Sequence, residues 1–242
     1  MQPRLSLIIP VYNAELFIED TVERLLAWKK GQNFSLELIL VNDGSTDKTK
    51  DLLEDLNDGS KNFSLISYTN NEGKGYAVKQ GMLYAKGDFK VFTDADIPYG
   101  LDVITNALKY LSIKEYDVCI GNRLDKDSNY LVKTSFVRKL SSKIFTFFIT
   151  KFTIDRVGDT QCGLKGYTKS AADKIFSKTR IKGFAFDVEC IYLCYKYHLN
   201  IKRIPVKFEG NNISTINLLN SSVKMAIDVL SLPIRYHLLK QY

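Results

Sequence analysis

The chain has 242 residues, of which 45% are hydrophobic and 25% are charged, and its formal net charge at pH 7 is +7. This hydrophobic content is enough for a globular core and excludes an intrinsically disordered chain. The positive charge favours a polyanionic partner, which includes a nucleic acid, a nucleotide phosphate or an anionic membrane surface. No apolar run reaches the roughly 18 residues of a membrane span, so we expect a soluble or peripheral intracellular protein.

Four cysteines are scattered along the chain without the Cys-x-x-Cys spacing of zinc or redox sites. We therefore expect them to be reduced and mostly buried.

The first quarter of the chain alternates apolar runs with helical patterns. Residues 5–11 predict a buried strand, and apolar side chains then recur at helical spacing over 18–26. Asn13 lies between these two segments and is a candidate helix N-cap. A second apolar run at 36–41 leads directly into 42–47, where a glycine turn and a hydroxyl cap open the next helix.

The same alternation continues to about residue 111. The sequence predicts strands at 63–69 and 89–92 and helices at about 76–85 and 101–111. Continuous apolar strands that alternate with helices predict an α/β fold with a mostly parallel sheet covered on both faces. Ligands bind beyond the carboxyl ends of such strands. Asp43, the loop at 73–75 and Asp94 all follow predicted strands, so we expect one crevice to contain them.

Asp94 and Asp96 directly follow the predicted strand at 89–92. In an extended backbone, residues two apart point the same way, so both carboxylates can face one object. A divalent cation such as Mg²⁺ or Mn²⁺, completed by substrate phosphates and water, would remove their mutual repulsion. The alternative is a solvated turn before Pro98.

The other polar residues at strand ends also have two interpretations. Asp43 either contacts a ligand or shapes its own turn. Lys74 either contacts a phosphate or is a solvated charge, because its loop lacks the P-loop and dinucleotide spacings. Arg123 follows a predicted strand at 116–120 and would neutralise a phosphate, or else is simply exposed.

The second half of the chain carries further ionisable candidates. Arg138 opens a basic and aromatic segment at 135–152, which predicts either a helix at a bilayer surface or a helix packed on the sheet. Asp159 is available as a base or as an orienting carboxylate. Asp187 and Glu189 lie near the start of a predicted helix, where the helix dipole favours acids in any case.

The end of the chain predicts an amphipathic helix. Within residues 216–239, apolar residues recur at spacings of four and three, namely Leu219, Val223, Ile227, Leu230 and Ile234. Pro233 is expected to kink or end this helix. Such a tail would dock on the rest of the protein, on a membrane or on another subunit, and the last case would produce a homo-oligomer.

Four motifs, in order and at the usual intervals, resemble those of inverting family-two glycosyltransferases with the GT-A fold. They are Ile-Pro-Val-Tyr-Asn at 9–13, Val-Asn-Asp-Gly-Ser at 41–45, Asn-Glu-Gly-Lys-Gly at 71–75 and Thr-Asp-Ala-Asp at 93–96. The segments at 159–165, 184–189 and 225–228 resemble the dolichyl-phosphate or polyprenyl-phosphate glucosyltransferases.

The resemblance implies a single GT-A domain over residues 1–242, with a nucleotide-sugar half at 1–115, an acceptor half at 116–210 and a tail at 211–242. It implies a divalent cation held by Asp94 and Asp96. The residues that it assigns to the nucleotide-sugar, together with those that the strand ends suggest, are Pro10, Tyr12, Asn13, Asp43, Lys74, Asp94 and Arg123.

The implied reaction is transfer of a hexose, glucose from UDP-glucose above all, to a polyprenyl or dolichyl phosphate at the cytoplasmic face of a membrane, with the protein bound peripherally. Arg138 and Lys165 would bind the acceptor phosphate. A hydroxyl acceptor in polysaccharide synthesis would instead need Asp159, Asp187 or Glu189 as a catalytic base. A catalytically inactive nucleotide-sugar-binding protein is a further alternative. A nucleic-acid-binding module is disfavoured, because the positive charge is spread along the chain and no binding motif is present.

Overall fold

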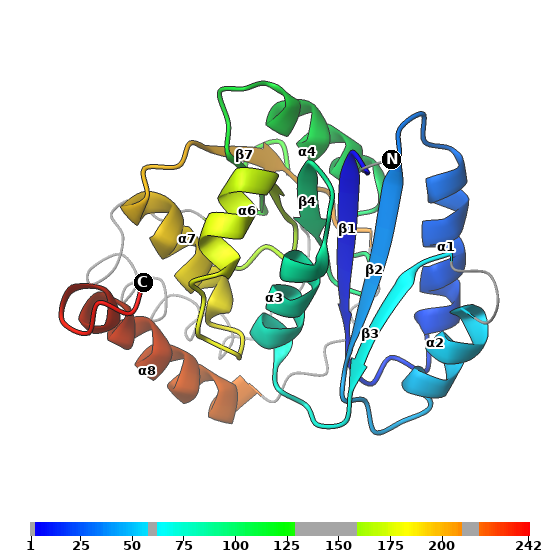
Figure 1. Cartoon of the computed structure of the whole chain (residues 1–242), viewed down its shortest axis with the longest axis horizontal. Coiled ribbons are helices and arrows are strands. Elements are labelled where there is room, and N and C mark those ends of the chain that lie inside the picture. Colours follow the sequence, from blue (N-terminus) through cyan, green and yellow to red (C-terminus); the bar gives the residue numbers. More distant parts are fainter. Residues whose placement is uncertain (1–2, 58–61, 129–158, 210–217) are drawn as a thin grey trace.

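A seven-stranded sheet forms the centre of the computed structural model (Figure 1). The structure describes residues 3–57, 62–128, 159–209 and 218–242, and for residues 218–224 it describes only the backbone. The strand order is β3-β2-β1-β4-β6-β5-β7. The strands are β1 (Leu5–Val11), β2 (Leu36–Asp43), β3 (Ser64–Tyr68), β4 (Phe89–Phe92), β5 (Val118–Asn122), β6 (Lys165–Thr168) and β7 (Ile201–Pro205).

All neighbouring strands are parallel except β6, which is antiparallel to both β4 and β5. The predicted α/β fold with a mostly parallel sheet is therefore confirmed. Every residue of β1 is buried, which explains why all of its residues except Ser6 are apolar. Each fully buried Leu or Ile there stabilises the fold by about 1.5–3 kcal/mol.

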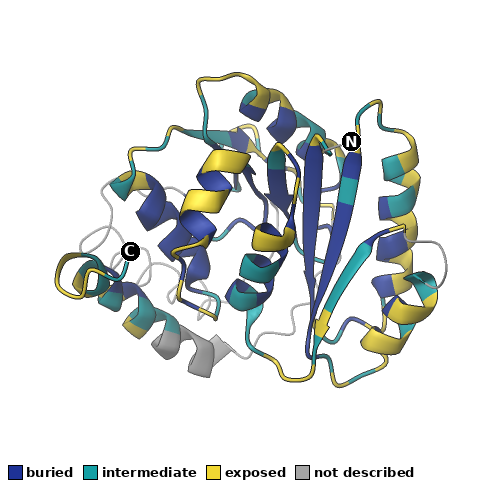
Figure 2. Ribbon diagram, viewed as in Figure 1, coloured by how far each residue is buried: buried dark blue, intermediate teal, exposed yellow. Residues whose placement is uncertain are grey.

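Helices cover both faces of the sheet (Figure 2). They are α1 (Ile18–Lys30), α2 (Thr49–Asn57), α3 (Lys74–Tyr84), α4 (Asp102–Ser112), α6 (Lys169–Phe176), α7 (Phe186–Lys196) and α8 (Leu218–His237). The apolar faces of α1, α2 and α4 share one core cluster, and those of α3, α6, α7 and α8 share the other.

Two predictions about helix ends are corrected by the structure, one of them in part. Asn13 does not cap α1, which begins at Ile18 after Phe17. Asn13 has a positive φ of 48° and instead binds the next strand-end loop, through its backbone N–H to Ser45 Oγ (3.0 Å) and its Oδ1 to the Thr46 N–H (2.8 Å). Of the two effects expected of Pro233, it does not end the last helix, because α8 continues to His237, and a kink stays a prediction.

The four cysteines are buried and form no disulfide, as predicted. Within the described ranges, no helix combines the length and the apolar character needed to cross a bilayer. The predicted segment at 135–152, including Arg138, lies outside the described residues.

Candidate functional site

Four strands, β1, β2, β4 and β5, run in the same direction, so their carboxyl ends lie at the same end of the sheet. The predicted site residues follow these strands, so the topology gathers most of them at this edge. Figure 1 shows β1 and β2 finishing at the lower end of the molecule.

Asp43, the last residue of β2, fixes the loop before α3. Its carboxylate accepts hydrogen bonds from the backbone N–H groups of Glu72 (2.9 Å) and Gly73 (2.9 Å) and from Asn71 Nδ2 (3.0 Å). Burial raises the pKa of Asp43, although the backbone donors oppose the rise. Gly44 is required beside it, since a Cβ there would lie 2.4 Å from the backbone of Asn70. Asp43 therefore positions the predicted phosphate loop, and its contact with a nucleotide stays a prediction.

Lys74 and Asp94 form an ion pair at the carboxyl end of the strands. Lys74 is the first residue of α3, and its Nζ lies 2.5 Å from Asp94 Oδ1. Burial lowers the pKa of Lys74, but the carboxylates of Asp94 and Asp187 outweigh that effect, and the net pKa is raised. Lys74 is therefore a firmly charged ammonium group.

Asp96 lies beside this pair. Its pKa is raised to about 6 by burial and by the neighbouring charge of Asp94. No group of three or more His, Cys, Asp or Glu side chains in the described part of the chain is arranged to hold a metal ion. Two carboxylates at a strand end nevertheless match the usual Mg²⁺ arrangement, in which substrate phosphates and water supply the remaining ligands.

Gly163 closes one side of the Asp94 carboxylate. A Cβ at this position would lie only 2.1 Å from Asp94 Oδ2, so any side chain at 163 would displace the Asp94 carboxylate. The sequence analysis did not single out Gly163. The only signal was a glycine within the polar segment before β6.

Arg123 and Asp159 form a two-pronged ion pair. Arg123 Nε lies 2.6 Å from Asp159 Oδ2 and its Nη2 lies 2.7 Å from Oδ1, while the Arg123 backbone N–H also donates to Oδ2 (3.0 Å). Burial raises the pKa of Asp159, but the bonds from Arg123 outweigh it and the net pKa is lowered. Arg203, which the sequence analysis overlooked within a strand pattern, donates to the Asp159 carbonyl oxygen (3.0 Å). These contacts suit an orienting carboxylate better than a base.

Lys165 and Asp187 form a second ion pair inside the protein. Lys165 Nζ contacts Asp187 Oδ1 and donates to the Cys162 carbonyl oxygen (2.8 Å), and its side chain is 0% exposed. Burial raises the pKa of Asp187, opposed chiefly by Lys165. Lys165 was predicted to bind the acceptor phosphate, but this enclosed position and its internal partners argue against that role.

Glu189 is fully buried in α7 and holds a neighbouring loop. Its carboxylate accepts from the backbone N–H groups of Arg180 (3.0 and 3.1 Å) and Ile181 (2.9 Å) and from the Tyr242 hydroxyl (2.5 Å). Burial raises the pKa of Glu189. This set of donors indicates a structural role and not that of a base. Arg180 itself is exposed, and its Nε donates to the Gln241 carbonyl oxygen (3.2 Å).

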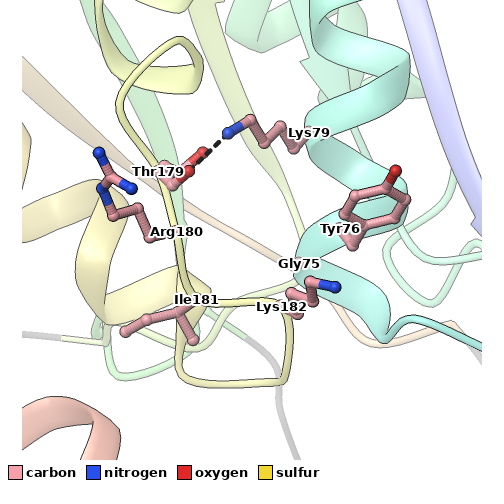
Figure 3. Close-up of a pocket in the computed structure, with 7 residues that line it drawn as sticks. All are labelled: Gly75, Tyr76, Lys79, Thr179, Arg180, Ile181 and Lys182. Carbon is pink, nitrogen blue, oxygen red and sulfur yellow. Dashed lines mark hydrogen bonds between the residues drawn. The ribbon is translucent and has the colours of Figure 1, made fainter.

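The loop held by Glu189 also contacts the start of α3. The Lys182 carbonyl oxygen accepts from the Tyr76 N–H (3.1 Å), and Lys182 Nζ lies 2.5 Å from Glu72 Oε2. Figure 3 shows a hollow between this loop and α3, lined by Gly75, Tyr76, Lys79, Thr179, Arg180, Ile181 and Lys182. Neither Asp94 nor Asp96 lines it, so this hollow is separate from the candidate cation site.

The remaining predicted residues lie at the end of β1. Pro10 is buried within the strand, whereas Tyr12 is 47% exposed just beyond it. Their predicted contacts with a nucleotide stay predictions.

Comparison with known proteins places this geometry in context. The family model described as "Glycosyl transferase family 2" matches residues 6–176. A dolichyl-phosphate beta-glucosyltransferase from Drosophila melanogaster is 31% identical over 96% of this chain and 75% of its own length. Proteins of the same name from Dictyostelium discoideum and Saccharomyces cerevisiae are each 30% identical over 96% of this chain and 74% and 75% of their own lengths, respectively.

Solved structures share the fold. Mannosyl-3-phosphoglycerate synthase from Rubrobacter xylanophilus aligns with a TM-score of 0.71 at 16% identity, over 98% of this chain and 75% of that one. Glucosyl-3-phosphoglycerate synthase from Mycobacterium tuberculosis, solved with Mn²⁺, UDP-glucose and phosphoglyceric acid, aligns with a TM-score of 0.69 at 17% identity, over 95% and 79% of the two chains. Both likenesses concern the fold alone.

Proposed function

The chain belongs to glycosyl transferase family 2, and on this premise we propose that it transfers glucose from UDP-glucose to a polyprenyl phosphate such as dolichyl phosphate. The names of the relatives support both the sugar and the acceptor. The proposal assigns the donor to the half at 1–115 and the acceptor to the half at 116–210.

The donor diphosphate would bind at the end of β4 together with a divalent cation, Mg²⁺ or Mn²⁺, held by Asp94 and Asp96. The pair of adjacent carboxylates and the Mn²⁺ in a solved structural neighbour support this assignment. A cation bound there would stabilise the negative charge that develops on the departing diphosphate.

Lys74 supplies a fixed positive charge at the same place. Its Nζ lies 2.5 Å from Asp94, and its raised pKa keeps it charged at neutral pH. Because the Asp43 carboxylate fixes the preceding Gly73 N–H (2.9 Å), Lys74 is presented from a defined position. Fixed cations of this kind stabilise a leaving group without reorganisation during the reaction.

The phosphate acceptor is supported chiefly by one observation: each of the three candidate bases already has a partner inside the protein. Asp159 is paired with Arg123, Asp187 is paired with Lys165, and Glu189 is occupied by backbone N–H groups and Tyr242. A hydroxyl acceptor needs a base, whereas a phosphate acceptor is already anionic. A phosphate oxygen of the acceptor would form a bond to the anomeric carbon while the bond to the diphosphate breaks, and UDP would leave with that electron pair.

The acceptor phosphate still needs cations of its own. Arg123 is proposed for the donor diphosphate instead, and its defined orientation against Asp159 supports that role. Arg138 is proposed for the acceptor from the sequence alone. We place the reaction at the cytoplasmic face of a membrane, with the protein bound peripherally.

The test incubates the purified protein with Mn²⁺ or Mg²⁺, radiolabelled UDP-glucose and a short polyprenyl phosphate in detergent, and then counts label in the organic extract. We expect label that depends on the added cation and on Asp96. The absence of lipid label, together with release of UDP in the presence of a saccharide acceptor, would refute the phosphate acceptor.

A further inference from the structure

The final helix carries a stripe of exposed apolar side chains. Three of the twelve exposed large hydrophobic residues in the described part of the chain belong to it, namely Ile227 (63% exposed), Leu230 (39%) and Ile234 (50%), and two more, Leu238 (76%) and Leu239 (56%), follow directly after its end at His237. Spacings of three and four place the three helical side chains, Ile227, Leu230 and Ile234, on one face of α8. We call this set the outer stripe of α8. It includes three residues that the sequence pattern selected as the apolar face of the tail.

A different face of α8 attaches it to the protein. Val229 and Leu232 are 0% exposed and join the core cluster shared with α7. The Tyr236 ring packs edge-on against Tyr192 of α7, with 5.8 Å between the ring centroids. The chain end is then fastened by the bond from the Tyr242 hydroxyl to Glu189. The inner face is therefore packed on the core, whereas the outer stripe is exposed and belongs to neither core cluster of the described residues.

The position of α8 relates this stripe to the candidate site. Figure 1 shows α8 in the lower part of the molecule, which is also the end at which β1 and β2 finish. α8 therefore lies toward the same end of the molecule as the carboxyl ends of these strands.

We propose that the outer stripe of α8 rests on the surface of a lipid bilayer that contains anionic lipids. This inference rests on the proposed function, under which the acceptor phosphate is carried by a lipid in a bilayer. Charge supports the choice of occupant: Lys240 is exposed, Lys196 Nζ lies 3.3 Å from His237 Nε2, and the chain has a net charge of +7. An amphipathic helix near cationic groups binds such surfaces without spanning them.

The first experiment reports contact at one position. The native cysteines are all buried, so Ile234→Cys introduces an accessible thiol that a polarity-sensitive fluorophore can label. Ile113→Cys is the matched control, because Ile113 is 46% exposed and directly follows α4, which Figure 1 shows in the upper part of the molecule. Vesicles of phosphatidylcholine and phosphatidylserine, without any acceptor, should shift the emission of the label at 234 to the blue and leave the label at 113 unchanged.

Two results would overturn the proposal. One is an unchanged emission at 234 when vesicles are added. The other is a blue shift at 234 that appears without vesicles and grows with protein concentration, which would assign the stripe to a second copy of the chain.

The second experiment measures binding and catalysis separately. The double variant Leu230→Ser with Ile234→Ser should lower the vesicle-bound fraction at least roughly tenfold in cosedimentation, since each change removes a large apolar side chain from the contact. Its rate with a short polyprenyl phosphate in detergent should stay within about twofold of wild type, because neither residue belongs to the candidate site. Unchanged cosedimentation would refute the docking surface.

These measurements also separate the two proposals. Loss of vesicle binding in a protein that makes no lipid-linked product would leave the docking surface standing and refute the proposed reaction. Normal transfer in detergent by a protein whose stripe does not contact vesicles would do the reverse.

Discussion

The carboxylates that follow β4 and those that surround β6 have the same chemistry and opposite surroundings. Asp94 and Asp96 crowd each other at the edge of the sheet, with Lys74 beside them. Asp159 and Asp187 are buried carboxylates that each have a cation of their own, the partly exposed Arg123 and the fully buried Lys165, respectively. Because Asp94 and Asp96 share the single ammonium group of Lys74, they can still attract a cation from outside, whereas a carboxylate with a cation of its own holds the fold together. The distinction depends on neighbours and not on residue type.

The largest expected effect comes from the crowded group. Asp96→Asn should lower the rate of glucosyl transfer about 10³-fold, because it removes a proposed ligand of the cation that stabilises the leaving diphosphate. The measurement is label transfer at saturating substrate, with Asp55→Asn on the exposed face of α2 as the control. More than a tenth of the wild-type rate in Asp96→Asn would place Asp96 outside the catalytic site.

Lys165→Met should give the largest loss of stability. It leaves the Asp187 carboxylate buried without its cation, and breaking such a pair costs about 3–5 kcal/mol of unfolding free energy. Urea denaturation measures this loss against Lys169→Met, which changes an ammonium that is 47% exposed and should cost under about 1 kcal/mol. Equal losses of unfolding free energy in the two variants would show that the buried ion pair contributes no more to stability than the exposed one.

A double variant separates the cost of the unpaired charge from the contribution of the ion pair itself. Lys165→Met combined with Asp187→Leu removes both charges, and it should recover part of the stability lost in the single variant. A double variant that is less stable than either single variant would show that the pair contributes more than the avoidance of an unpaired charge.

The sequence pattern was sufficient to locate the carboxylates that follow β2 and β4, but it was insufficient to predict the ion pairs of Asp159 and Asp187. Strands β1, β2 and β4 are predominantly apolar segments, so their ends, and with them Asp43 and Asp94, could be located from the pattern alone. The partners of Asp159 and Asp187 lie 36 and 22 residues away. Those contacts depend on β6 being antiparallel between two parallel neighbours, which the local pattern does not specify.

The last helix shows a second limit of sequence patterns. The spacing correctly indicated an amphipathic helix, but it selected Ile227, Leu230 and Ile234, which are exposed, whereas Val229 and Leu232 are the buried side chains. Helical periodicity shows that apolar residues share a face and does not show what that face contacts.

Asp159→Asn tests whether the partly exposed pair behaves like the buried one. The variant leaves the Arg123 guanidinium without its carboxylate and should cost about 2–3 kcal/mol of unfolding free energy at pH 7. The pKa of Asp159 is lower in the folded protein than its ordinary value of 3.8, so its ionised form stabilises the fold above that pH. The difference in unfolding free energy between wild type and variant should therefore be constant near neutral pH and shrink as the pH falls below 3.8. A difference that does not change over this range would attribute the loss to packing and not to charge.

Tyr242→Phe should have the smallest effect, because it removes one of several hydrogen bonds to a buried carboxylate. The hydroxyl donates to Glu189 Oε1 at 2.5 Å, and its loss should cost about 1 kcal/mol, since the backbone N–H groups of Arg180 and Ile181 still donate. Urea denaturation gives the free energy, with Tyr195→Phe at an exposed position of α7 as the control. Hydrogen exchange at the amides of Arg180 and Ile181 should accelerate if Glu189 acts as the anchor of this loop. Unchanged exchange in a destabilised variant would mean that Tyr242 holds only α8, and that the loop beside α3 is fixed without it.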